Sequence, residues 1–205
     1  MKKWCSLWTL LCFCLTAKAQ DEFILQAATL KKGLYRSFRE FQQNSPSESG
    51  DLIVKNRSTA AQIYLLASRN ELVLRDAAGQ EHKVKNFWGF CDGTHIYIKD
   101  NGLNVIQATG YYCTYELQGV QPSRSAYNPA DMTVNALNTP VRLKKVINIV
   151  TGEILELSLF NLKKYILPQD PELLEEFRAD KAKKDKLDYY ISRFNTRNKP
   201  PQTGQ

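Results

Sequence analysis

Short strands separated by glycine-containing turns fill the middle of the chain and constrain its fold most strongly. Runs rich in apolar residues predict strands at 52–55, 62–67, 71–75, 87–91, 94–99, 104–108 and 111–117. Asp92-Gly93 lies between two of them and is the strongest short-range hairpin signal in the chain. Regular short strands joined by such turns predict an antiparallel meander.

Helix signals lie at both ends of this region. Ser37 with Glu40 three residues later has the form of a capping box and predicts a short helix from Ser37. Asp170-Pro171-Glu172 combines a capping residue, a first-turn proline and an acidic residue, and predicts a second helix start. The fold class is therefore α+β, a mainly antiparallel sheet with a short N-terminal helix and a C-terminal helical segment.

The C-terminal helical segment keeps apolar residues at helical spacing except across a charged gap at 180–186. The gap indicates either one helix that leaves the body midway or two helices with a break. Because a helix with little apolar face adds little to a core, we expect deletion of 179–205 to leave the β-domain folded.

Residues 118–140 interrupt the strand pattern with three prolines and no sustained periodicity, and predict a long loop. Loops of this length are functional or disordered, and both alternatives stay open. A further hairpin is predicted around Thr151-Gly152. The chain is thus divided into a leader at 1–19, a β-rich domain at 20–168 and a basic helix with a frayed tail at 169–205.

The first nineteen residues have the three parts of a cleavable secretory signal. They are a positive start at Lys2 and Lys3, an apolar run over 7–15, and small residues at Ala17 and Ala19. The apolar run is too short for a bilayer core of about 30 Å. We therefore expect an exported chain without a transmembrane segment, in the periplasm, at the outer-membrane periphery or outside the cell.

Positive charge is concentrated near the C-terminus. The formal net charge is +7, and it falls to +4 when the three lysines of the leader are removed. Residues 178–199 hold eight basic and three acidic side chains. Nucleic acid is a poor explanation, because export separates the chain from it and no binding module is recognisable. A solvated helix face and contact with an anionic surface both explain the excess.

Two cysteines, Cys91 and Cys113, remain after removal of the leader. Two are too few for a disulfide scaffold, so the fold depends on a hydrophobic core. An oxidising compartment permits a Cys91–Cys113 bond. The competing interpretation is two separate buried thiols that pack as small apolar groups.

The sequence carries no catalytic, metal-binding or nucleotide-binding motif. Cys91 and His95 lie close together, as a thiol protease requires, but a two-residue hairpin pairs Cys91 with Thr94 and Phe90 with His95. The thiol and the imidazole then point to opposite faces. We therefore predict no catalytic residues, no metal and no cofactor, and favour a non-enzymatic role.

One face of this hairpin collects aromatic residues. The residues that share it are Trp88, Phe90, His95 and Tyr97. The opposite, core-like face holds Phe87, Gly89, Cys91, Thr94, Ile96 and Ile98. Either a second layer covers the aromatic face and makes it core, or the face is an exposed binding patch.

Three segments support a resemblance. They are 33–41 with the following Asn44-Ser45-Pro46, 87–93 (FWGFCDG) and 189–195 (YYISRFN). With these segments the chain resembles an uncharacterised family of exported proteins common in Bacteroidota. The resemblance implies a periplasmic or outer-membrane location in a Gram-negative cell and carries over no activity and no site residues.

Two functions follow from these observations. The first is a non-enzymatic cell-envelope protein that binds an envelope protein or an apolar ligand through Trp88, Phe90, His95 and Tyr97. The alternative is an envelope hydrolase with dispersed carboxylates and no local motif. A cleft with two carboxylates about 5–10 Å apart would favour the hydrolase.

Overall fold

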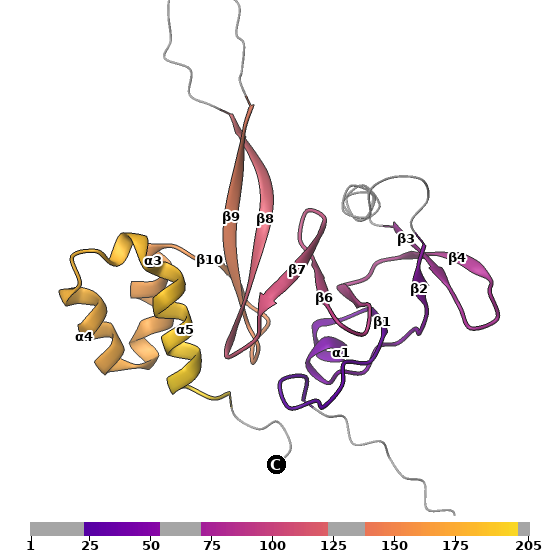
Figure 1. Ribbon diagram of the computed structural model, residues 1–205, viewed down its shortest axis with the longest axis horizontal. Helices are drawn as coiled ribbons and strands as arrows, with labels where there is room; N and C mark the ends of the chain where they lie inside the picture. Colours follow the sequence, from indigo (N-terminus) through magenta and orange to yellow (C-terminus); the bar gives the residue numbers. More distant parts are fainter. Residues whose placement is uncertain (1–22, 54–70, 123–137, 201–205) are drawn as a thin grey trace, which may run out of the picture.

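The computed structural model describes residues 23–53, 71–122 and 138–200, which form two antiparallel sheets and a set of C-terminal helices (Figure 1). The seven-stranded sheet has the order β1-β5-β6-β7-β8-β9-β10. Its strands are β1 (Gly33–Tyr35), β5 (Gly89–Cys91), β6 (Ile96–Lys99), β7 (Leu103–Ala108), β8 (Tyr112–Pro122), β9 (Asn138–Asn148) and β10 (Ile154–Glu156). The small sheet contains β2 (Asp51–Leu52), β3 (Glu71–Arg75) and β4 (Glu81–Lys85).

Strands β5 to β10 are neighbours in the order of the chain, so the predicted α+β meander is confirmed. Within the described residues, no helix is long and apolar enough to cross a membrane. The leader at 1–19 and the strand predicted at 62–67 lie outside the described residues.

The Asp92-Gly93 hairpin forms with a wider turn than predicted. Cys91 pairs with Ile96 and not with Thr94. The Asp92 carboxylate accepts hydrogen bonds from the backbone N–H groups of Thr94 and His95, at 2.7 and 2.6 Å, and so closes a four-residue turn. The register moves by two residues, which leaves the pairing parity of the two strands unchanged.

The β8–β9 hairpin is the longest in the sheet and projects from the body (Figure 1). Its ladder ends where Pro122 pairs with Asn138, so the loop predicted at 118–140 is wrong at both ends. Residues 123–137 lie outside the described residues. Pro140 is tolerated in β9 because β10 pairs only with residues 145–147, which leaves this half of β9 at an edge.

Helix starts follow the predicted capping signals. In helix α1 (Phe38–Gln42) the Ser37 hydroxyl accepts from the backbone N–H of Glu40, and the Glu40 carboxylate accepts from that of Arg36. In helix α4 (Pro171–Ala179) the Asp170 carboxylate accepts from the backbone N–H of Leu173 at 3.2 Å. The two caps satisfy N–H groups that a helix start leaves unpaired.

The C-terminal lobe comprises residues 159–197. Its elements are α3 (Leu159–Asn161), the π-helix η1 (Leu162–Ile166), the 3-10 helix η2 (Leu167–Gln169), α4, the 3-10 turn η3 (Lys183–Asp185) and α5 (Leu187–Arg197). Of the two alternatives for the charged gap, two helices with a break are correct.

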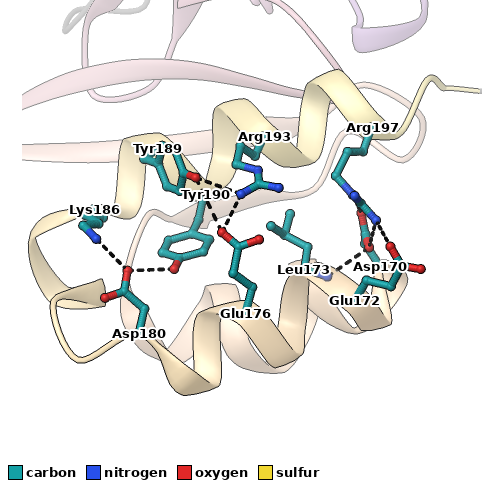
Figure 2. A network of polar contacts seen from close by, with 10 residues as sticks. All are labelled: Asp170, Glu172, Leu173, Glu176, Asp180, Lys186, Tyr189, Tyr190, Arg193 and Arg197. Atoms are coloured by element: carbon teal, nitrogen blue, oxygen red, sulfur yellow. Dashed lines mark hydrogen bonds and ion pairs between the residues drawn. The ribbon is translucent and has the colours of Figure 1, made fainter.

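Polar contacts connect α4 to α5 along their length (Figure 2). Arg197 donates to the Asp170 carboxylate at 2.6 Å, and Arg193 donates to Glu176. Beyond the end of α4, the Asp180 carboxylate accepts from the hydroxyl of Tyr190 at 2.8 Å. Arg193 and Arg197 of α5 are therefore both paired with carboxylates at or within α4.

Three apolar clusters make up the core. The first lies between the sheet and α1 and includes Phe41, Cys113, Tyr115 and Ile147. The second joins the other face of β8 and β9 to the C-terminal lobe and includes Tyr112, Val146, Phe177, Tyr190, Ile191 and Phe194. The third joins the small sheet to β1, β5 and β7 and includes Leu34, Leu72, Leu74, Val84, Phe90 and Leu103.

Candidate functional site

The predicted aromatic face does not form one exposed surface. Phe90 is only 1% exposed and packs in the cluster beneath the small sheet, and half-buried Tyr97 packs against the same cluster. Trp88 instead stacks on Phe41 of α1, with 4.6 Å between ring centroids. His95 is an exposed residue of the turn. The four residues thus do not share one face, and only Phe90 and Tyr97 are covered by the small sheet.

The split has a local cause at Gly89. Phe87 and Phe90 pack in the cluster of the small sheet, whereas Trp88 packs in the cluster of α1, so the alternation of faces slips by one residue between them. A Cβ atom at Gly89 would lie 2.5 Å from the Tyr97 carbonyl oxygen. Only glycine permits this close strand pairing, and the slip separates Trp88 from Phe90.

Of the two interpretations of Cys91 and Cys113, the structure has the second, two free and buried thiols. Their strands, β5 and β8, are separated by β6 and β7, which amounts to about 14 Å along the sheet. A disulfide needs Cα atoms about 4.4–6.8 Å apart. Burial raises the pKa of Cys91 and raises that of Cys113 to about 11, which disfavours the reactive thiolate form of both.

An open groove of about 560 Å³ lies on the surface between α5 and the sheet. Most of the side chains that line it are small or carry uncharged polar groups. The lining residues are Gln107, Ala108, Thr109 and Gly110 at the end of β7, Thr114 of β8, Lys144 of β9, and Asp188, Ile191, Ser192, Asn195 and Thr196 of α5.

One end of the groove is held by a side-chain amide. The Asn195 amide donates to the backbone carbonyl of Tyr112 at 2.8 Å and accepts from its N–H at 2.9 Å. A Cβ atom at Gly110 would lie 2.5 Å from the Asn195 amide. A glycine at this position therefore lets α5 approach the start of β8 closely enough to form both bonds.

Strands β7, β8 and β9 supply the sheet side of the groove. Lys144 forms an ion pair with Asp188 across the groove. In the β7–β8 ladder, Ile106 pairs with Tyr115 and Ala108 pairs with Thr114, so one residue is left over at position 107. A bulge of this kind bends a strand and redirects its side chains, here at the groove wall.

The lining determines what the groove can do chemically. Asp188 is its one carboxylate, and it is paired with Lys144. The pair of carboxylates that would favour a hydrolase does not line this groove. Across the described ranges, no group of three or more His, Cys, Asp or Glu residues is placed to hold a metal ion. Hydroxyl and amide groups make the groove suited to hydrogen bonding with an uncharged ligand.

Sequence reasoning missed the groove residues. Asn195 carried one usable signal, because it is a polar residue directly after Phe194 in the apolar stripe of α5. Lys144 and Asp188 carried none, because they are 44 residues apart and only the docked helix brings them together.

The comparisons with known proteins yield a family and no activity. Neither the curated proteins nor the solved structures contain a match to this chain. Strands β9 and β10 and the C-terminal lobe lie outside the family match. The resemblance to an uncharacterised family is confirmed for the matched part, since residues 33–119 match the model of a family described as "Family of unknown function (DUF6563)".

Proposed function

We propose that this protein is an exported, non-enzymatic protein of the cell envelope that binds a ligand in the groove between α5 and the β7–β8–β9 sheet. The observation that carries the proposal is the lining of the groove, with its hydroxyl and amide groups and a single ion-paired carboxylate. The aromatic residues of the β5–β6 hairpin are largely engaged in packing, which moves the binding site away from them.

The lining favours a neutral ligand rich in hydrogen-bonding groups, such as an extended peptide segment or a sugar chain. Thr109, Thr114 and Ser192 offer hydroxyls that act as donors and acceptors. An apolar ligand would remove these groups from water without replacing their hydrogen bonds, at about 1–3 kcal/mol for each group. The proposed ligand is therefore polar, in place of the apolar ligand expected from the sequence.

Export is supported by the leader at 1–19, with its basic start, short apolar run and alanines at the peptidase positions. Protein isolated from its own cell envelope should begin at Gln20 or its cyclised form. Recovery of the chain with Met1 intact from that source would contradict export, and would leave the binding proposal to be tested separately.

The binding proposal is tested by following backbone amide resonances of residues 20–205 during titration with neutral peptides and with neutral envelope oligosaccharides. We expect saturable shifts at Thr114, Ser192 and Thr196 with one ligand class. Ser192→Tyr fills the groove and should weaken binding about tenfold or more, which corresponds to a loss of about 1.4 kcal/mol or more of binding free energy.

Thr151→Tyr, at an exposed turn outside the groove, is the matched control and should bind as the unaltered protein does. Equal binding by the two variants, or no shift in the groove with either ligand class, would rule out this site. Release of cleaved sugar or peptide during the titration would instead support the hydrolase alternative.

A further inference from the structure

The start of the C-terminal lobe exposes aromatic rings on its outer side. Phe160 is 62% exposed and Tyr165 is 42% exposed. The opposite side of the same turn is docked, since Leu162 and Ile166 are fully buried in the cluster of the lobe. The outer side of a docked helical turn normally carries polar residues, so two exposed rings in this position need an explanation.

The π-helix brings the two rings together. Phe160 and Tyr165 are five residues apart, and five residues of a regular α-helix correspond to a rotation of about 140°. In η1 the backbone N–H of Leu167 bonds to the carbonyl of Leu162, five residues back, which widens the turn. The rings consequently meet edge to face, with 6.1 Å between their centroids.

Lysine residues accompany the rings. The Lys164 ammonium lies 5.1 Å from the centroid of the Phe160 ring and 5.0 Å from that of Tyr165. Lys163 is exposed beside it. No Asp or Glu occurs in residues 157–169, and neither lysine forms an ion pair with the described part of the chain. We call Phe160, Lys163, Lys164 and Tyr165 the aromatic–lysine patch.

The C-terminal basic residues are in a different situation. Arg178, Lys186, Arg193 and Arg197 all form ion pairs with carboxylates of the lobe itself. Their charge is largely compensated locally. Other lysines of 178–199 have no such pair within the described residues, and what distinguishes residues 160–165 is that Lys164 lies against two exposed aromatic rings.

We infer that the aromatic–lysine patch is a contact site for the surface of a lipid bilayer that contains anionic lipids. Aromatic rings are favoured at the boundary between headgroups and acyl chains. Lysine side chains beside them can extend to lipid phosphates.

The patch is small, so the attachment is weak and reversible. Stable membrane binding generally takes two signals, here the apolar rings and the positive charge. Removing either signal should therefore weaken binding strongly. The inference is independent of the groove, because no residue of the patch lines the groove.

Co-sedimentation of residues 20–205 with vesicles tests the inference. We expect binding to vesicles of phosphatidylcholine with phosphatidylglycerol, and much weaker binding to phosphatidylcholine alone. The double variants Phe160→Ala with Tyr165→Ala, and Lys163→Glu with Lys164→Glu, should each lower the partition coefficient about tenfold or more. Added salt should weaken binding of the unaltered protein.

Two controls separate the patch from its surroundings. Tyr189→Ala removes another exposed ring, 46% exposed on α5, and Lys183→Glu with Lys184→Glu reverses charge in η3. Both should bind as the unaltered protein does. The inference is overturned if the unaltered protein binds no vesicles, if it binds neutral and anionic vesicles equally, or if folded patch variants bind undiminished.

Discussion

The C-terminal lobe and the small sheet cover different ends of the seven-stranded sheet and are attached to it by different means (Figure 1). The small sheet is attached mainly by apolar side chains of β3 and β4, including Leu72 and Val84, with Glu48 and His82 as a polar link at 3.2 Å. The lobe combines an apolar cluster with side-chain bonds to the strand backbone and a network between its own helices.

The difference teaches that a high density of charge does not indicate a detachable segment. Residues 178–199 are the most basic part of the chain, yet Tyr190, Ile191 and Phe194 are among its most buried side chains. Arg178, Lys186, Arg193 and Arg197 pair with carboxylates of the lobe, and the apolar stripe of α5 docks on the sheet.

The largest expected effect comes from removing α5. Deletion of 179–205 should abolish cooperative thermal unfolding, because it exposes Tyr112, Val146 and Phe177 to water. The structure thereby predicts the opposite of the sequence-based expectation. Circular dichroism during heating is the measurement, and a chain that ends at Asn198 is the control, which should unfold cooperatively.

Single truncations in the two regions come next. Phe194→Ala in the lobe should cost about 3–5 kcal/mol, and Leu72→Ala in the small sheet about 2–5 kcal/mol, because both side chains are fully buried. Denaturant titration followed by Trp88 fluorescence and by circular dichroism measures both. If the regions fold as one unit, the two probes coincide for each variant, and separate transitions for Leu72→Ala would show that the small sheet unfolds alone.

A smaller effect is expected at the contact between α5 and β8. Asn195→Ala leaves the N–H and carbonyl groups of Tyr112 without these partners and should cost about 2 kcal/mol. Asn195→Asp keeps the acceptor and loses the donor, so its cost in stability should be smaller than that of Asn195→Ala. Thr196→Ala, on the neighbouring exposed position, should change stability by less than about 0.5 kcal/mol. A cost for Asn195→Ala as small as that of the control would show that water replaces both bonds.

The smallest expected effect is on the pH dependence of stability, through Asp170. Hydrogen bonds from Arg197 hold the pKa of Asp170 at about 2, below its usual value near 4. The carboxylate thus contributes stability above pH 4 that is lost as pH falls through 2. Asp170→Asn keeps a helix cap and should lose about 1–2 kcal/mol at neutral pH.

The unfolding free energy of Asp170→Asn should also vary less between pH 4 and pH 2 than that of the unaltered protein. Glu175→Gln breaks an exposed pair with Arg178 and should leave the acid profile unchanged. If the unfolding free energy of Asp170→Asn kept its full dependence on pH, the ion pair between Asp170 and Arg197 would contribute little to docking of the lobe.

Local signals in the sequence predicted much of this fold. The caps at Ser37 and Asp170 and the hairpins at Asp92-Gly93 and Thr151-Gly152 depend on residues a few positions apart, and all four are present. The two-residue register error arose because a side chain, the Asp92 carboxylate, closes the turn. The preference of Asp-Gly for two-residue turns does not take such a side-chain bond into account.

The candidate site could not be predicted in the same way. The groove exists because α5 packs on β8, and the residues that meet there are distant in sequence and individually ordinary. The aromatic face failed for a related reason, since a single slip at Gly89 sends Trp88 and Phe90 into different clusters. Alternation predicts a face only while the strand stays regular.

The bond between Asn195 and Tyr112 also sets an order of folding events. The two residues are 83 positions apart, so the ribosome makes β8 well before it makes α5. Until it emerges, the outer face of β8 and β9 has no cover and remains open to association with other chains. Docking of the lobe must therefore follow synthesis of α5, and before that the uncovered sheet is a substrate for chaperones that hold exposed apolar surface.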